Sequence, residues 1–296
     1  MLKWRLIVGP LLVAAAVGLL SVDARMGDSA PLLWLLCMAL VLRGVWELDQ
    51  LFKTRSFETR YALPAVCSVV IVTANWLPHW LGDLVPEIRP LGLLGPAYLA
   101  FGVSVMVLFV EAAGRYRGPG RTMETLGAEL LMICYIGVLM SLTIQLRWVG
   151  TPDLGYTPFG SLIVVAKAGD IAAYFAGRAF GRSKLVPHLS PGKTWAGFRG
   201  AVIGSVLASC VWFGLIVPAY LPTYTVPPGW AMLLYGLMIG LAGLVGDLCE
   251  SLIKRDVGKK DSGALLPGFG GLLDLLDSIL FPGPLAFVLW LLLPLR

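Results

Sequence analysis

The chain has 296 residues, of which 57% are hydrophobic and only 14% are charged, and its mean hydropathy is +0.81. Soluble domains carry about 25% charged residues, so this composition excludes an ordinary soluble enzyme and indicates an integral membrane protein. The net charge of +5 follows from basic residues in the loops and gives no indication of nucleic-acid binding.

Nine apolar segments follow one another along the chain, each long enough to cross a bilayer as a helix of about 20 residues. They cover residues 5–22, 31–48, 63–82, 90–111, 125–146, 157–179, 199–220, 229–252 and 275–294. Their apolar character is continuous, whereas the strands of a membrane β-barrel alternate between apolar and polar residues. We therefore predict an all-α polytopic membrane protein with about nine transmembrane helices.

Residues 1–24 have two interpretations. The "VDA" sequence before Arg25 resembles the small-residue cleavage site of a signal peptide. The other eight segments, however, alternate consistently with a first span that is retained. We expect a first transmembrane helix, with a cleaved signal as the alternative.

Lys and Arg divide unequally between the two sides that nine alternating spans create. One side carries Lys3, Arg5, Lys53, Arg55, Arg60, Arg115, Arg117, Arg121, Arg178, Arg182, Lys184, Lys193, Arg199, Lys254, Arg255, Lys259 and Lys260. The other side carries Arg25, Arg89, Arg147 and Arg296. The positive-inside rule then predicts a multi-pass protein of the cell (inner) membrane with a cytoplasmic N-terminus and an outside C-terminus.

The two halves of the chain differ in polar content. Residues 1–156 show few polar features beyond loop charges and predict a set of N-terminal transmembrane helices. Residues 157–296 carry charged side chains within spans and two long, basic, glycine-rich loops on the predicted inner side. We expect this C-terminal part to be the catalytic region of one continuous membrane domain.

Two pairs of carboxylates stand at helical i, i+3 spacing near the predicted inner face: Asp247 with Glu250, and Asp274 with Asp277. A single carboxylate at a helix end is explained by its exposure to solvent or by a favourable interaction with the helix dipole. Two pairs facing one compartment repel, and a hard cation such as Mg²⁺ relieves that repulsion. Together with Asp261, they predict a one- or two-metal site for phosphoryl or nucleotidyl transfer, which faces the cytoplasm.

A second polar cluster lies in the loop "KLVPHLSPGKTWAG", residues 184–197. Its "GKT" suggests a Walker A motif, but the required glycine is replaced by Pro187 and no strand precedes the loop. Ser190, Lys193 and Thr194 nevertheless offer hydroxyl and ammonium groups that suit a polyphosphate. Within the sixth segment, Lys167 and Asp170 are also at i, i+3 spacing and predict an ion pair.

Residues 251–277, "SLIKRDVGKKDSGALLPGFGGLLDLLD", resemble the signature of phosphatidate cytidylyltransferases (CDP-diacylglycerol synthases). That signature runs S-x-x-K-R, four residues, K-D-x-G, then P-G-H-G-G, and ends D-R-x-D. The matching positions are Ser251, Lys254, Arg255, Lys260, Asp261, Gly263, Pro267, Gly270, Gly271, Asp274 and Asp277. Two positions depart from it, since Phe269 replaces the histidine and Leu275 replaces the arginine. The segment from Gly169 to Gly197 also resembles this family.

The resemblance implies transfer of CMP from CTP to phosphatidic acid, giving CDP-diacylglycerol and pyrophosphate for phospholipid biosynthesis, with Mg²⁺ as cofactor. The catalytic residues it implies are Asp247, Asp261, Asp274, Asp277, Lys254 and Lys260. The substrate-binding residues it implies are Ser190, Lys193, Thr194, Ser251, Arg255, Gly270 and Gly271. Metal would be held by Asp247, Asp274 and Asp277. The expected partners are CTP, phosphatidic acid and the bilayer, without nucleic acid, and a homodimer is left open.

Three alternatives stay open at this point. A CTP-dependent lipid-alcohol kinase of a related superfamily would transfer the γ-phosphoryl group and need a general base. A membrane transporter would use the intramembrane charges as ion or substrate sites, although carriers place those sites near the midplane. An inactive paralogue is suggested by Phe269 and Leu275.

Overall fold

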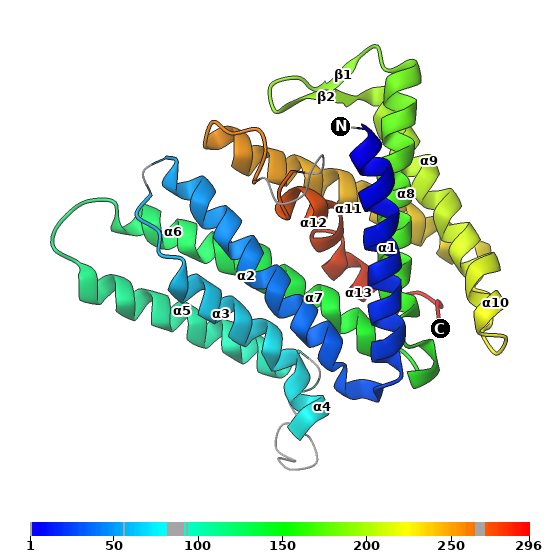
Figure 1. Cartoon of the computed structure of the whole chain (residues 1–296), viewed down its shortest axis with the longest axis horizontal. Coiled ribbons are helices and arrows are strands. Elements are labelled where there is room, and N and C mark those ends of the chain that lie inside the picture. Colours follow the sequence, from blue (N-terminus) through cyan, green and yellow to red (C-terminus); the bar gives the residue numbers. More distant parts are fainter. Residues whose placement is uncertain (1, 56, 82–91, 93, 264–269) are drawn as a thin grey trace. The chain divides into compact units, whose positions relative to one another are not determined.

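The computed structural model describes the chain except residues 1, 56, 82–91, 93 and 264–269, and except the side chains of residues 2–10, 12, 13 and 152. The chain forms two compact units, each described here by itself (Figure 1). Unit 1 comprises Met1–Leu142 and Asp261–Leu273, and unit 2 comprises Thr143–Lys260 and Asp274–Arg296. Residues 261–273 therefore group with the N-terminal helices, although they lie within the predicted C-terminal region 157–296.

Unit 1 is built from helices. They are α1 (Leu2–Ala24), η1 (Gly27–Ser29), α2 (Pro31–Lys53), α3 (Ala62–Thr73), η2 (Ala74–Trp76), α4 (Leu77–Leu81), α5 (Gly95–Arg115), α6 (Thr122–Met132) and the π-helical turn η4 (Ile133–Val138), after which α7 (Leu139–Ile144) leads into unit 2. A buried apolar cluster that includes Ile71, Leu108 and Ile133 joins α3, α5 and η4.

Unit 2 combines helices with one small hairpin. Its elements are η5 (Gln145–Trp148), η6 (Pro152–Leu154), α8 (Thr157–Phe180), β1 (Lys184–Val186), β2 (Ser190–Thr194), α9 (Trp195–Val211), η7 (Trp212–Ile216), α10 (Val217–Tyr220), α11 (Gly229–Asp256), α12 (Leu273–Leu280, from its second residue) and α13 (Gly283–Leu292). Strands β1 and β2 are antiparallel, with Lys184 opposite Thr194 and Val186 opposite Ser190.

Small residues let the helices of unit 2 approach closely. A Cβ atom added at Gly204 of α9 would lie 3.0 Å from the Ala168 carbonyl oxygen of α8. At Gly236 of α11, it would lie 2.6 Å from the Cα atom of Val206 on α9. Backbone-to-backbone contact of this kind is the usual way in which helices associate in a membrane, where burial of apolar surface provides no driving force.

A small cluster of polar side chains in the buried core of unit 2 is joined by hydrogen bonds. The Ser161 hydroxyl lies 2.7 Å from the Tyr235 hydroxyl, and the Trp290 indole N–H donates to Ser161 Oγ over 3.0 Å. Tyr235 and Trp290 are both fully buried among apolar side chains. Each polar atom of this cluster therefore finds a partner away from water, as a helix bundle in lipid requires.

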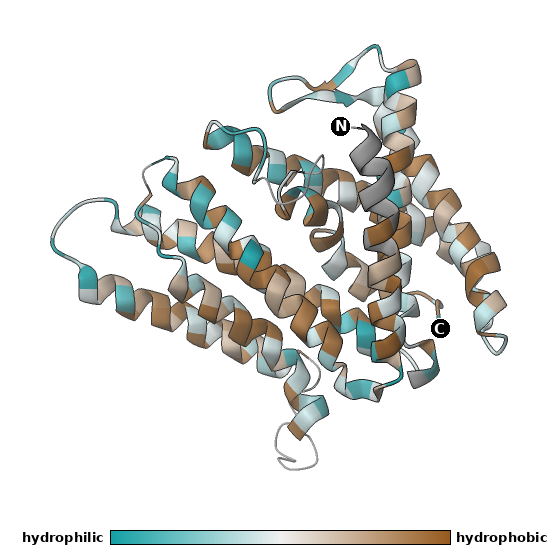
Figure 2. Cartoon of the chain, in the orientation of Figure 1, coloured by the Kyte–Doolittle hydropathy of each residue, from teal (hydrophilic) through white to brown (hydrophobic). Residues whose placement is uncertain are grey.

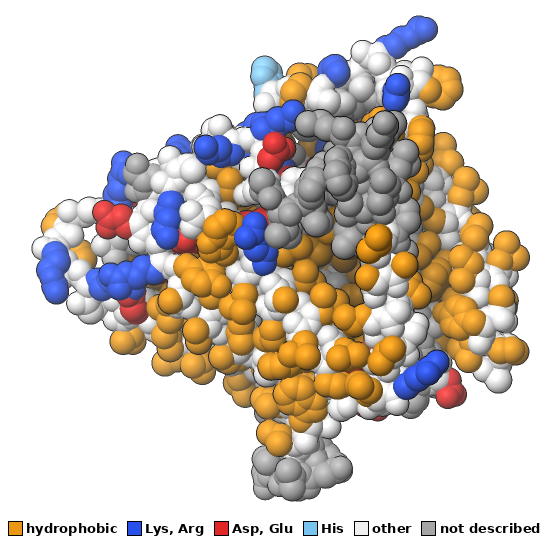
Figure 3. Space-filling view, viewed as in Figure 1, with side chains coloured by type: hydrophobic (Ala, Val, Ile, Leu, Met, Phe, Trp, Pro, Cys, Tyr) orange, Lys and Arg blue, Asp and Glu red, His pale blue; other side chains and the backbone are white. Residues whose placement is uncertain are grey.

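Eight helical runs among the described residues are long and apolar enough to cross a membrane. They are Gly27–Lys53, Ala62–Leu81, Gly95–Arg115, Thr122–Trp148, Thr157–Phe180, Trp195–Tyr220, Gly229–Asp256 and Leu273–Leu292. These runs overlap the second to ninth predicted segments. Figure 2 shows hydrophobic residues along the helices, and Figure 3 shows hydrophobic side chains over much of the visible face. A multi-pass, predominantly helical membrane protein is confirmed, whereas the total of nine spans and the orientation of the termini stay predictions.

Candidate active site

Three carboxylates of unit 2 converge at the junction of α11 and α12. Asp247, Glu250 and Asp277 each offer an oxygen atom, and these three oxygens lie within 4.8 Å of one another. Asp247 and Glu250 share one face of α11 through their i, i+3 spacing, and Asp277 comes from α12. Glu250 and Asp277 are buried, while the Asp247 side chain is 42% exposed. The cluster is thus accessible to solvent at Asp247.

The Glu250 carboxylate shows that this cluster suits a cation. Its Oε2 atom accepts a hydrogen bond from Lys254 Nζ over 2.8 Å. Its Oε1 atom is buried and has no hydrogen-bond partner among the described residues. A buried acceptor without a partner is costly, and a hard divalent cation is the partner that three clustered carboxylate oxygens favour. The residues present therefore fit the predicted Mg²⁺.

Lys254 holds a fourth carboxylate beside the cluster. The Lys254 side chain is buried, and its ammonium also donates to Asp274 Oδ1 over 2.5 Å. This ammonium neutralises part of the negative charge that the acidic residues of α11 and α12 bring together. The predicted ligand set is Asp247, Asp274 and Asp277. In the structure, Glu250 instead of Asp274 lies with the clustered oxygens, and Asp274 forms an ion pair with Lys254.

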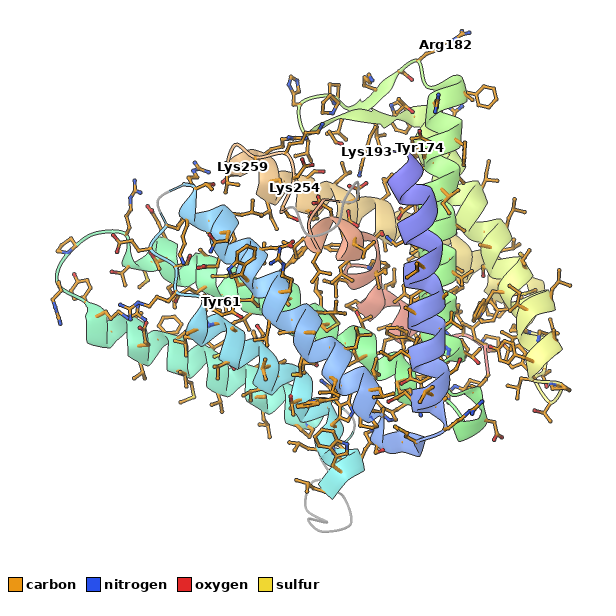
Figure 4. All side chains as sticks on the ribbon, viewed as in Figure 1. Tyr61, Tyr174, Arg182, Lys193, Lys254 and Lys259 are labelled. Atoms are coloured by element: carbon orange, nitrogen blue, oxygen red, sulfur yellow. The ribbon has the colours of Figure 1, made fainter. Side chains whose placement is uncertain are left out.

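The β1–β2 hairpin brings a basic residue to the exposed edge of the cluster. Lys193 of β2 pairs with Asp247 Oδ2 over 2.8 Å and also approaches the Leu244 carbonyl oxygen at 3.4 Å. Lys193 and Lys254 are labelled in Figure 4. Lys193, which the sequence predicts as a substrate-binding residue, therefore lies beside the acidic cluster of unit 2.

The other predicted residues of the hairpin have structural partners. Thr194 is the N-cap of α9, because its side-chain oxygen accepts from the Gly197 N–H over 3.1 Å. Ser190 stands opposite Val186 in the hairpin register. These contacts shape the loop that carries Lys193, and no observation tests substrate binding by either hydroxyl.

The end of α11 carries the remaining predicted basic residues of unit 2. Arg255 donates from Nε to the Leu189 carbonyl oxygen over 3.4 Å and from Nη1 to the Lys259 carbonyl oxygen over 3.1 Å. It therefore ties the hairpin turn to the end of the helix. Ser251 is buried, and Lys260 is exposed.

Lys167 of α8 reaches the helix that carries the second acidic pair. Its predicted ion pair with Asp170 is confirmed, with Nζ and Oδ2 3.4 Å apart. The same ammonium also donates to Ser278 Oγ over 2.7 Å and to the Leu275 carbonyl oxygen over 3.0 Å. These contacts join residues more than 100 positions apart, so helical spacing gives no signal for them.

Three predicted site residues belong to unit 1. Asp261 is exposed, Gly270 adopts a φ of +88° that favours glycine, and Gly271 packs against the carboxylate of Glu47 on α2. Phe269 lies outside the described residues. Glu47 was not among the predicted site residues. Its i, i+4 pairing with Arg43 can be read from the sequence, but its donors Ser262 and Leu272 lie 215 and 225 positions away and leave no local pattern.

Comparisons with known proteins identify the family to which the chain belongs. Residues 3–293 match the model of the cytidylyltransferase family. The phosphatidate cytidylyltransferase of Chlamydia muridarum is 30% identical over 294 residues, which cover 97% of this chain and 92% of that protein. The phosphatidate cytidylyltransferase of Brucella suis is 40% identical over 139 residues, which cover 47% of this chain and 48% of that protein.

A further relative has a name that states no activity. The uncharacterized protein YnbB of Escherichia coli is 47% identical over 126 residues, covering 43% of this chain and only 40% of YnbB. The match to the family model, by contrast, runs along almost the whole chain. The chain therefore belongs to the cytidylyltransferase family, a family of nucleotidyltransferases.

Proposed function

We propose that this protein transfers CMP from CTP to phosphatidic acid, giving CDP-diacylglycerol and pyrophosphate for phospholipid biosynthesis. The observation that carries the proposal is the convergence of Asp247, Glu250 and Asp277, with the buried Glu250 Oε1 lacking a partner in the described structure. Membership of the cytidylyltransferase family and the names of the Chlamydia and Brucella relatives support it.

In the reaction, an oxygen of the lipid phosphate attacks the α-phosphorus of CTP. The bond from this phosphorus to the oxygen bridging the α- and β-phosphates breaks, and pyrophosphate leaves with that electron pair. The attacking phosphate is already ionised at neutral pH, so the reaction needs no general base. The protein's contribution is then positioning and neutralisation of charge.

Asp247, Glu250 and Asp277 would hold Mg²⁺ in this proposal. The ion, when bound, would neutralise charge on the transferring and leaving phosphate groups. Asp274 is kept in place by the Lys254 ammonium, with which it shares a 2.5 Å contact. The sequence also predicts Asp274 as a metal ligand, and its Oδ1 atom is the one that contacts Lys254.

The basic side chains around the carboxylates would bind the phosphates of the substrates. Lys193 is held by Asp247 at 2.8 Å, which points its ammonium toward the acidic cluster. Arg255 keeps the hairpin turn beside the end of α11 through two backbone carbonyls. We place this site at the cytoplasmic face of the membrane, because residues 178–199 and 254–260, which flank it, carry nine of the chain's 23 Lys and Arg residues.

A label-transfer assay tests the proposal directly. The purified protein is incubated with Mg²⁺, phosphatidic acid and CTP labelled separately at the α and γ positions. We expect the α label to enter the lipid while the γ label leaves in pyrophosphate. Transfer of the γ label would instead demonstrate a CTP-dependent kinase, and no transfer to any lipid would favour a transporter or an inactive paralogue.

A further inference from the structure

Glu47 of α2 is a fully buried carboxylate in an apolar helix of unit 1. Four hydrogen bonds hold it. Its Oε1 atom accepts from Arg43 Nε over 3.1 Å and from the Leu272 N–H over 2.9 Å. Its Oε2 atom accepts from Ser262 Oγ over 3.0 Å and from the Leu273 N–H over 3.0 Å. A charge inside a membrane protein is costly, so such complete satisfaction indicates a defined task.

The donors to this carboxylate come from both ends of one segment of the signature. Ser262 precedes residues 263–271 in the chain, and Leu272 and Leu273 follow them. Because one oxygen atom accepts from Ser262 and from Leu273 alike, a single side chain binds described residues on both sides of residues 264–269. The described residues 262, 263 and 270–273 are called the signature segment below.

Two signature glycines make room for the carboxylate. A Cβ atom added at Gly263 would lie 3.1 Å from Glu47 Oε1. At Gly271, it would come closest to Ser262 Oγ, and it would lie 2.5 Å from Glu47 Oε2 and 2.7 Å from the backbone nitrogen of Gly263. Any side chain at Gly271 would therefore displace the Ser262 hydroxyl and the carboxylate from each other. The glycines and the carboxylate form one interlocking arrangement.

The same contacts determine where α12 begins. Leu272 and Leu273 stand at the start of this helix, and the first N–H groups of a helix have no partner within it. Glu47 accepts from these two N–H groups and so caps α12 with a negative charge, which the helix dipole favours. Asp274 is the residue that directly follows these two donors in the chain.

We propose that Glu47 is the positioning residue of the signature segment, acting as a latch that holds both of its ends and caps α12 for binding of CTP. The catalytic consequence of the latch rests on the proposed function. The latch itself has a direct structural consequence that does not depend on activity, namely protection of the backbone amides that Glu47 binds.

The test compares the full-length protein with its Glu47→Gln variant in detergent micelles. Glutamine keeps the size of the side chain, but it has one acceptor oxygen and presents N–H groups to the remaining donors. We expect hydrogen exchange of the amides at the end of the signature segment to be accelerated by about tenfold or more. We also expect kcat/KM for CTP to fall by about tenfold or more, with most of the change in KM.

Asp49→Asn is the matched control. Asp49 lies on the same helix, is equally buried, and accepts from Thr59 Oγ1 over 2.9 Å and from Lys53 Nζ over 2.6 Å. It therefore anchors the loop after α2 rather than the signature segment. We expect this variant to lower the thermal stability of the protein while leaving both the exchange of the signature segment and KM for CTP unchanged.

Gly271→Ala tests the arrangement without altering any charge. Its methyl group should displace the carboxylate and reproduce the effect of Glu47→Gln on exchange and on KM. Because both changes release the same latch, the double variant should be no worse than the stronger single variant, a non-additivity expected of residues in contact.

Two results would overturn the proposal. One is that the amides of the signature segment exchange at the wild-type rate in Glu47→Gln. The other is that Asp49→Asn accelerates their exchange as much as Glu47→Gln does. Additive effects of Glu47→Gln and Gly271→Ala on exchange would also contradict it. If the wild-type protein transfers no label from CTP, the proposed function fails. The hydrogen-exchange rates of the single and double variants then still decide whether Glu47 holds the signature segment in place.

Discussion

At the scale of single residues, the candidate site is a problem of charge. Asp247, Glu250 and Asp277 bring three carboxylate oxygens within 4.8 Å of one another, and Lys254 reaches only one of these three residues within 4.0 Å. In the proposed function, a bound divalent cation would compensate the remaining repulsion, so we expect metal binding and folding stability to be coupled. Glu250 is the residue most suited to reveal this coupling, because its Oε2 atom accepts a hydrogen bond from Lys254, whereas its Oε1 atom has no hydrogen-bond partner among the described residues.

We expect Glu250→Gln to reduce cytidylyl transfer by about tenfold to a hundredfold or more, since the amide replaces a charged ligand. The midpoint of the Mg²⁺ dependence should rise. Without metal, the variant should be no less stable than the wild type toward heat, because one of three repelling charges is gone. Thermal denaturation of both proteins in detergent, at increasing Mg²⁺ concentrations, measures these stabilities. Mg²⁺ should raise the melting temperature of the wild type but not that of Glu250→Gln.

Glu124→Gln is the control for this variant. Glu124 is an exposed partner of Arg121 on unit 1, so its replacement changes the net charge equally without touching the carboxylate cluster. We expect wild-type transfer and wild-type stabilisation by Mg²⁺. A Glu250→Gln protein that retains the full stabilisation by Mg²⁺ would refute the assignment of Glu250 as a ligand.

At the scale of elements, close packing of α8, α9 and α11 supports the site. Helix α11 carries Asp247 and Glu250, and α9 packs against it where a Cβ at Gly236 would clash with the backbone of Val206. The hairpin that carries Lys193 connects α8 to α9. The separation between these helices therefore decides whether the ammonium of Lys193 reaches Asp247.

We expect Gly204→Leu to separate α8 from α9, because its side chain would meet the Ala168 carbonyl region at about van der Waals contact or closer. The melting temperature in detergent should fall markedly, and transfer activity should fall with it. Gly102→Leu on α5 is the matched control, since nothing lies within 4 Å of a Cβ atom at Gly102. A similar loss of stability in both variants would show that the α8–α9 contact is not responsible.

At the scale of the whole molecule, the distribution of basic residues predicts the topology. The loop between α5 and α6 and the loop after α11 are rich in Lys and Arg, whereas residues 221–228 between α10 and α11 carry no charge. The positive-inside rule assigns the first two loops to the cytoplasm and the third to the opposite side. A cytoplasmic site is also where CTP is available.

Cysteine labelling of the full-length protein tests this topology. A membrane-impermeant maleimide added to intact cells should label Val226→Cys, whose position is exposed, but not Gly118→Cys. In inverted membrane vesicles the pattern should reverse. The wild-type protein, whose five cysteines are buried or partly buried, supplies the background. Labelling of Gly118→Cys in intact cells would place the candidate site on the outer face.

Much of the architecture follows from composition and local pattern alone. Continuous apolar runs specify membrane helices because a bilayer leaves no other partner for the backbone, and eight of the predicted segments agree with described helical runs. The acidic pairs were predictable because i, i+3 spacing places side chains on one face. The last predicted segment also agrees with one such run, Leu273–Leu292, although a turn at residues 281–282 divides this run into α12 and α13.

The sequence by itself determined the membrane class, most of the helical segments, the basic and acidic residues of the site and the family resemblance, because each is encoded in neighbouring residues. Only the tertiary structure decided which acidic residues share a site. It placed Glu250 with Asp247 and Asp277, placed Asp274 on Lys254, and joined Glu47 to residues 215 and more positions away. Such pairings depend on how helices pack against one another, and helical spacing within a single segment carries no information about that packing.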